Sequence, residues 1–216
     1  MTLKIKDGQT ILFIGDSITD CGRRAAERPL GNGYVKLFYD MLTIREPEKK
    51  VNIINKGISG DTVTGLQARW TDDVLVHKPE WLSIKIGIND LHINLRQGGG
   101  GDTISPQVFH NTYNDILSRI KSALPKCEIL LIEPFYISIE ENRESFRKSV
   151  LDLIPEYIEV VREMSKKYKT RLVKTHEMFQ TFLKHHDADT FCPEPVHPYL
   201  IGHMAIAETI YATLSK

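Results

Sequence analysis

A serine follows the first apolar segment of the chain, at a position where its hydroxyl could act as a nucleophile. Ile11 to Ile14 form a short apolar run, and Gly15-Asp16-Ser17 comes directly after it. A serine between a strand and a helix start can expose its hydroxyl, while its own N–H and the helix dipole face developing negative charge. Asp16 or Ser17 could equally be an ordinary helix N-cap, so this block alone leaves both interpretations open.

Two later blocks could supply hydrogen-bond donors to an oxyanion. Gly60 belongs to a glycine-containing turn after a second strand, where a backbone N–H could approach a substrate closely. Asn89 follows a third strand, and its amide side chain could donate to the same oxygen. Each block also has a structural interpretation: a turn capped by Asp61 or Thr62, and an amide that bridges two loops.

A histidine near the C-terminus could act as the general base. The segment Glu194-Pro195-Val196-His197 places a carboxylate three residues before the imidazole. In a turn, this spacing can bring the carboxylate to Nδ1, which fixes the tautomer and leaves Nε2 free to accept a serine proton. The alternative is an exposed loop histidine beside a helix start. The joint occurrence of four such blocks, in order, favours a Ser-His hydrolase.

The elements that must position these blocks form a repeating strand-helix pattern. Five short runs are expected to be strands, at 10–14, 51–55, 81–86, 128–132 and 171–173. Amphipathic segments are expected to be helices at 34–44, 62–76, 106–124, 146–167 and 198–214. This alternation predicts a parallel sheet covered by helices on both faces, with the ligand site at the carboxyl ends of the strands. Ser17, Gly60 and Asn89 all follow such ends.

Length, charge and cysteine content narrow the class of protein. A chain of 216 residues that is 41% hydrophobic is expected to form one domain, 1–216. Lys plus Arg and Asp plus Glu are both 28, so no charge excess favours a nucleic-acid or membrane partner. No charged leader precedes a long apolar segment, which predicts a soluble protein. The odd number of cysteines, three, favours a reducing compartment, and we expect the cytoplasm.

Taken together, the four blocks resemble those of the GDSL-type or SGNH hydrolases, which are named for a Ser, a Gly, an Asn and a His. The resemblance extends from Ile11 to the final helix. It implies a single-domain, three-layer α/β/α sandwich with a five-stranded parallel sheet, the flavodoxin-like SGNH fold. It also implies Ser17 as nucleophile, His197 as base, and an oxyanion hole made by the N–H groups of Ser17 and Gly60 with the Asn89 side chain. No cofactor or metal is expected.

Several segments are similar to intracellular acetyl-xylo-oligosaccharide esterases within that family. These segments are 13–22, 56–60, 68–70, 86–90, 134–136 and 197–204. The similarity implies a serine esterase that removes small acyl groups, such as acetyl, from acetylated oligosaccharides. A homo-oligomer is consistent with it.

The acid that orients the histidine departs from the family pattern. The family usually places Asp three residues before the His, whereas this chain has Glu194 with a proline on each side. We expect Glu194 to take this role, because other Ser-His hydrolases use Glu. Asp187 or Asp189 is the alternative if the prolines turn Glu194 outward. Asp16 and His92 are expected to line the substrate site.

We considered three alternative functions and the roles of two loops. A lipid or acyl-thioester hydrolase of the same family would have the same catalytic residues, and a non-catalytic carbohydrate-binding relative would have the same fold. A two-metal phosphoesterase fails because the chain lacks the required Asp-x-His pair. The loop 21–33, which is rich in arginine, could cover the site and select substrate, whereas the glycines at 98–101 favour a flexible connector.

Overall fold

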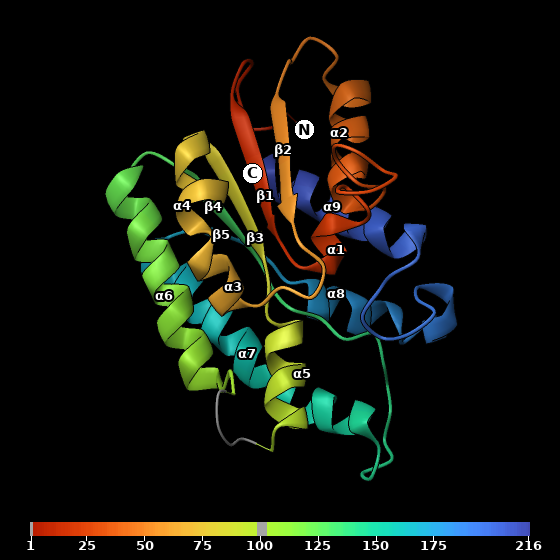
Figure 1. Ribbon diagram of the computed structural model, residues 1–216. Coiled ribbons are helices and arrows are strands. Elements are labelled where there is room, and N and C mark those ends of the chain that lie inside the picture. Colours follow the sequence, from red (N-terminus) through yellow and green to blue (C-terminus); the bar gives the residue numbers. More distant parts are fainter. Residues whose placement is uncertain (1, 99–102) are drawn as a thin grey trace.

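The sheet of this protein is parallel and has the predicted five strands (Figure 1). The computed structural model describes residues 2–98 and 103–216, so the predicted connector at 98–101 lies outside the described residues except for Gly98. The strand order is β2-β1-β3-β4-β5. The strands are β1 (Thr10–Gly15), β2 (Asn52–Gly57), β3 (Trp81–Lys85), β4 (Glu128–Ile132) and β5 (Arg171–Val173). The predicted three-layer α/β/α architecture is confirmed.

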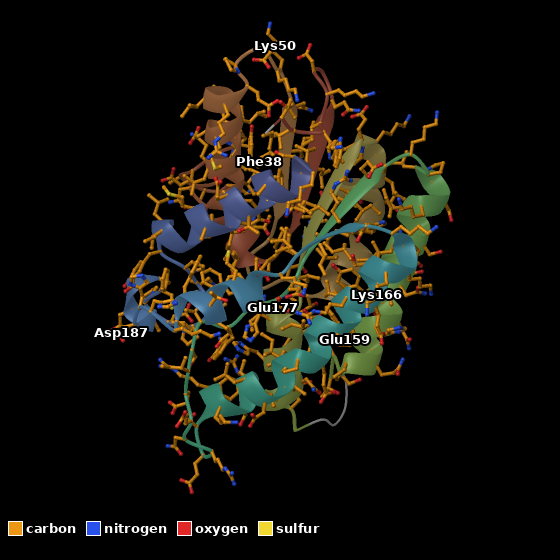
Figure 2. All side chains as sticks on the ribbon, turned by 180° about the vertical axis from the view of Figure 1, so that it is seen from behind. Phe38, Lys50, Glu159, Lys166, Glu177 and Asp187 are labelled. Atoms are coloured by element: carbon orange, nitrogen blue, oxygen red, sulfur yellow. The ribbon has the colours of Figure 1, made fainter. Side chains whose placement is uncertain are left out.

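Helices cover both faces of the sheet. On one face, α2 (Tyr34–Arg45) and α9 (Leu200–Leu214) pack against each other, as Figures 1 and 2 show. On the other face, α6 (Pro106–Ala123) contacts both α3 (Val63–Ala68) and α7 (Phe146–Tyr168). The remaining helices are α1 (Ser17–Asp20), α4 (Trp70–Asp73), η1 (Leu75–His77), α5 (Ile88–Arg96), α8 (Thr175–Phe182) and η2 (Ala188–Thr190).

The helix predicted at 62–76 is wrong as a continuous element. It is divided into α3, α4 and η1, and the first break falls at Arg69, whose φ of −100° and ψ of 9° leave the helical region. The side chain of Arg69 binds Asp61 and Asp73, and these contacts hold the chain in the interrupted form. The short helices α5 and α8 were not among the predicted helices, although the apolar residues of both recur at helical spacing.

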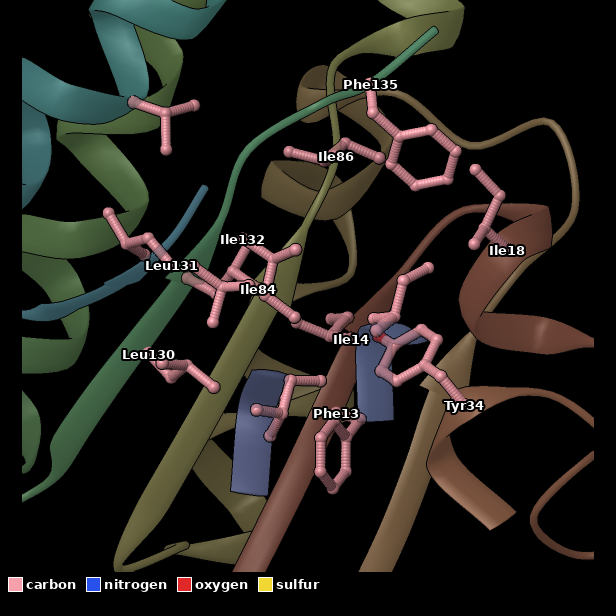
Figure 3. Close-up of a cluster of buried hydrophobic side chains, with 14 of the residues drawn as sticks. Phe13, Ile14, Ile18, Tyr34, Ile84, Ile86, Leu130, Leu131, Ile132 and Phe135 are labelled. Atoms are coloured by element: carbon pink, nitrogen blue, oxygen red, sulfur yellow. The ribbon is translucent and has the colours of Figure 1, made fainter. Parts of the chain in front are cut away.

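The central strands are buried on both faces, as their continuous apolar sequences predict. Every residue of β3 is buried, and so is every residue of β1 after Thr10. Figure 3 shows Ile14, Ile84 and Ile132 from three neighbouring strands in one apolar cluster. Charged side chains such as Lys166 lie on the outside (Figure 2). Among the described helices, none combines the length and the apolar character needed to cross a membrane.

Strand register brings the predicted catalytic blocks together at one edge of the sheet. Gly15 at the end of β1 pairs with Gly57 of β2 and with Lys85 of β3. Both glycines are required by close backbone approach: a Cβ on Gly15 would lie 2.2 Å from the Lys85 carbonyl oxygen, and one on Gly57 would lie 2.3 Å from the Asp20 nitrogen. The residues that follow these aligned ends therefore share one small region.

Candidate active site

Ser17 and His197 lie in direct contact although 180 residues separate them. Ser17 begins α1 directly after β1, and His197 lies in the loop before α9. The distance between Ser17 Oγ and His197 Nε2 is 2.8 Å. This is hydrogen-bond distance, which a base needs in order to take a proton from a hydroxyl.

Glu194 faces the other side of the same imidazole. Its carboxylate is hydrogen-bonded to His197 Nδ1 and accepts the backbone N–H groups of Val196 and His197, both at 2.9 Å. Burial raises the pKa of Glu194, but the hydrogen bonds from Val196 and His197 outweigh burial, and the pKa lies below its usual value. The prolines do not turn Glu194 outward, and the structure brings Glu194, rather than Asp187 or Asp189, to His197.

The loop that carries His197 is attached to the segment after β4. The Ile137 N–H donates to the Pro195 carbonyl at 2.9 Å, and the Tyr199 N–H donates to the Phe191 carbonyl at 2.6 Å. Even so, 55% of the His197 side chain and 43% of the Glu194 side chain are exposed. The geometry of this pair therefore depends mainly on the hydrogen bonds within its own turn.

The prediction that Asp16 lines the substrate site is wrong, because its side chain is fully buried. Its carboxylate accepts the Ile18 N–H at 3.0 Å as the N-cap of α1 and forms an ion pair with Lys85 at 3.1 Å. Lys85 is itself buried and lies over the Phe135 ring. Burial lowers the pKa of Lys85, and the charge of Asp16 opposes that effect. Asp16 thus fixes the turn beneath Ser17 from inside the protein.

Three candidate oxyanion donors follow neighbouring strand ends. Within the described part of the chain, the backbone N–H groups of Ser17 and Gly60 have no hydrogen-bond acceptor. Gly60 has a φ of +81°, a conformation that favours glycine. Asn89, in the first turn of α5, donates one Nδ2 hydrogen to the Asp61 carbonyl at 2.9 Å, and the second hydrogen of that amide has no acceptor among the described residues.

Charged side chains hold the Gly60 turn in place. Arg69 donates from Nε to the Asp61 carboxylate at 2.8 Å and from Nη1 to both the Lys56 carbonyl and Asp73. Burial raises the pKa of Asp73, but Arg69 and Lys56 outweigh it and lower the pKa. Because Lys56 lies in β2, this network ties the end of that strand to the turn that follows it.

The buried carboxyl group of Asp90 joins the two segments that follow β2 and β3. Asp90 accepts the Val63 N–H at 2.8 Å through Oδ1, which joins the start of α5 to the start of α3. Burial raises the pKa of Asp90 to about 7. Its other oxygen, Oδ2, is buried and has no hydrogen-bond partner in the described residues.

His92 lies one turn after Asn89 on the same face of α5 and is half-buried. Its ring packs against Tyr136 and Phe146, with centroid distances of 6.0 and 5.4 Å. Burial, and to a smaller extent Arg96, lowers the pKa of His92 to about 4. The imidazole is therefore uncharged at neutral pH.

Sequence reasoning missed Lys85, Asp90 and Arg69. A signal for the first existed, because a lysine inside an otherwise apolar buried strand needs a buried partner. Arg69 also had a local signal, because Asp73 lies four residues after it, whereas the partner of Asp90, Val63, lies 27 residues away. In the described ranges, 2–98 and 103–216, no cluster of three or more His, Cys, Asp or Glu side chains could hold a metal ion.

Comparison with protein families identifies the chain. Residues 13–205 match the model of the GDSL-like lipase/acylhydrolase family. The chain belongs to this family. Acetylxylan esterase from Geobacillus stearothermophilus is 37% identical over 212 residues, which cover 95% of this chain and 93% of the relative. The GDSL-like family is one of carboxylic ester hydrolases, and this protein is a member of that enzyme class.

Solved structures of GDSL-like hydrolases share the fold over nearly the whole chain. The crystal structure of the same Geobacillus stearothermophilus esterase, Axe2, has a TM-score of 0.86 and 34% identity, and the match covers 99% of this chain and 97% of that one. Structures of Axe2 variants described as catalytic mutants replace a serine, an aspartate and a histidine, the last two being three positions apart. A more distant relative, thioesterase 1/protease 1/lysophospholipase L1 of Escherichia coli, is 26% identical over 57% of this chain and 50% of its own length.

Proposed function

We propose that this protein is a serine esterase that removes acetyl groups from short, acetylated xylan-derived sugar chains, with residues 1–216 acting as one catalytic domain. The single observation that carries the catalytic part is the contact series from Ser17 Oγ to His197 Nε2, and from His197 Nδ1 to Glu194. A hydroxyl, an imidazole and a carboxylate in this order are the groups that acyl transfer through a serine requires.

In the proposed reaction, His197 takes the Ser17 proton as the oxygen attacks the ester carbonyl. Glu194 holds the imidazole in the tautomer with Nδ1 protonated and stabilises the imidazolium that forms. The N–H groups of Ser17 and Gly60 and the Asn89 amide donate to the developing oxyanion. The alcohol leaves with the proton from His197, and water activated by the same imidazole then releases the acid from the acyl-enzyme.

Support for the substrate comes from the relatives. The protein that shares 37% identity over nearly the full length is an acetylxylan esterase, and Axe2 is described as an acetyl-xylooligosaccharide esterase. The thioesterase and lysophospholipase relative matches only about half of its own length.

The test compares acetate release from acetylated xylo-oligosaccharide with hydrolysis of p-nitrophenyl acetate, butyrate and octanoate. We expect acetate to be the preferred acyl group, the sugar to lose acetate, and Ser17→Ala to abolish both activities. A preference for octanoate would instead assign a lipid-like substrate. A Ser17→Ala variant as active as the native protein would contradict the catalytic assignment.

We also propose a cytoplasmic location and a homo-oligomeric state. The three cysteines are free thiols, which supports a reducing compartment.

Four exposed apolar side chains at the start of α9 support the proposed homo-oligomer, namely Tyr199, Leu200, Ile201 and Met204. Such a patch supports contact with another copy of the chain. Light scattering during size-exclusion chromatography tests the assembly, and a monomeric mass would contradict it.

A further inference from the structure

A groove runs along the outer edge of β2, beneath the loop 21–33. Among the described strands, β2 pairs with β1 alone, and the loop 21–33 contacts its other edge. The groove has a volume of about 570 Å³, within the usual range for small-molecule sites. Its floor includes Ile53, Ile54 and Leu30, and its charged lining consists of Arg23, Arg24 and Arg28. The proposed catalytic residues do not line it.

The cations of this groove exceed the acidic groups that face them. Asp20 contacts Arg24 Nε at 3.4 Å. Glu27 and Lys36 line the adjoining part of the groove, so three guanidinium groups and one ammonium group face two carboxylates. In the described part of the chain, the Nη atoms of Arg23 and Arg24 have no hydrogen-bond acceptor. Arg28 donates from Nη2 to the Arg24 carbonyl at 3.2 Å, which places these two arginines side by side and leaves Arg28 Nη1 without an acceptor among the described residues. A guanidinium group with free Nη donors matches the geometry of a carboxylate or another planar anion.

The walls of the groove are already in place. Arg23 donates from Nε to the Gly57 carbonyl at 2.6 Å, which attaches the start of the loop to the end of β2. The Asn55 amide donates to the carbonyls of Leu30 and Thr19, both at 2.7 Å, which attaches the end of the loop to the same strand. A ligand would therefore not have to order the loop, and a preformed site loses less free energy on binding.

The groove continues along the strand and begins near the proposed active site. Its continuation, about 480 Å³, shares Arg28, Leu30 and Ile53 and adds the exposed Tyr39. At the other end, the Arg23 contact is with Gly57, three residues before Gly60. The C–H faces of sugar rings pack on apolar and aromatic side chains, and arginine side chains bind anions. The lining of the groove therefore suits a sugar chain that carries negative charge.

We propose that this groove binds an acidic stretch of the sugar chain, with a uronic acid carboxylate held by Arg24 and Arg28, while an acetyl group of the same chain lies at Ser17. The assignment rests on the proposed function for its substrate class. It makes the loop 21–33 a determinant of substrate choice, through recognition of charge away from the reacting ester.

The experiment compares two acetylated xylo-oligosaccharides of equal length, one of which carries a uronic acid branch. For each enzyme, kcat and KM for acetate release are measured at low and high salt and divided by the same enzyme's rate on p-nitrophenyl acetate. The enzymes are the native protein, Arg28→Gln, Arg24→Gln/Arg28→Gln, and the control Lys126→Gln/Lys166→Gln, whose lysines are exposed and do not line the groove.

We expect the native protein and the control to prefer the acidic chain by about 10-fold in kcat/KM, through a lower KM that rises with salt. The preference falls in Arg28→Gln and disappears in the double variant. Equal rates on both chains in the native protein, or a preference that survives in the double variant, would overturn the inference.

A binding measurement separates this inference from the proposed function. If neither chain loses acetate, the proposed function fails, and calorimetry with the unacetylated acidic chain then decides about the groove. Binding by the native protein that is about 10-fold weaker in Arg24→Gln/Arg28→Gln supports it. No binding, or binding of inorganic phosphate as tight as that of the acidic chain, overturns it.

Discussion

The proposed nucleophile and the proposed base are held in opposite ways. Ser17 follows a buried, close-packed turn, in which Asp16 forms an ion pair with Lys85 and Gly15 has no space for a side chain. His197 stands on an exposed turn that its own neighbour, Glu194, keeps in shape. The core of the protein therefore positions Ser17, whereas hydrogen bonds within one turn position His197.

The largest effect should come from removing the base itself. His197→Ala leaves Ser17 without a proton acceptor, so kcat for p-nitrophenyl acetate should fall about 10,000-fold or more. The free energy of unfolding should change little, because the side chain is more than half exposed. Kinetics with a urea unfolding curve check both, and a loss below 100-fold would contradict the proposed base.

Breaking the buried ion pair between Asp16 and Lys85 should lower the free energy of unfolding. Lys85→Met leaves the Asp16 carboxylate buried without its partner, and we expect a loss of about 3–5 kcal/mol in the free energy of unfolding. The variant Asp16→Asn/Lys85→Met removes both charges and should regain much of that loss. Lys166→Met, at an exposed position, serves as the control. Equal unfolding midpoints for Lys85→Met and the control would contradict a tightly packed ion pair.

A substitution of Asn89 tests its proposed role as a donor in the oxyanion hole. Asn89→Ala removes one donor, and we expect kcat to fall about 100- to 1000-fold, with a smaller change in unfolding. Among the described residues, the Asn89 side chain makes one hydrogen bond, to the Asp61 carbonyl, and the loss of one such bond should not unfold the protein. If stability fell sharply while kcat stayed within 10-fold, Asn89 would instead be a structural bridge between loops.

The raised pKa of Asp90 predicts how the free energy of unfolding depends on pH. Burial raises its pKa to about 7, well above the unfolded value near 4, so the folded state keeps this proton to higher pH. The contribution of Asp90 to the free energy of unfolding therefore falls as pH rises from about 4 to 7. Asp90→Asn should lack this fall and gain stability relative to the native protein at pH 8. Parallel unfolding midpoints of both proteins from pH 4 to 8 would contradict it.

The smallest effect should be that of Glu194→Asp in the exposed turn. The variant keeps a carboxylate three positions before His197, as in Axe2, and shortens it by one methylene. We expect kcat to change by less than about 10-fold, whereas Glu194→Gln should cost about 10,000-fold because it cannot hold the same tautomer. Similar losses in both variants would show that distance, rather than the carboxylate, limits the reaction.

The five strands could be predicted from the sequence, because short apolar runs that alternate with amphipathic helical segments are typical of a parallel sheet covered by helices. The sequence also indicated Glu194 as the partner of His197, since a spacing of three residues is a local property of one turn. The ordered blocks, together with their family resemblance, predicted that Ser17, Gly60 and Asn89 would gather, because the carboxyl ends of parallel strands share one edge.

The role of Asp16 depends on contacts between distant elements. Its partner, Lys85, lies 69 residues away, and their contact depends on the register between β1 and β3, which no local pattern encodes. The same holds for the arginine groove, whose lining comes from the loop 21–33 and from β2. Contacts within one turn follow from backbone geometry, whereas contacts between elements follow from how the whole chain packs.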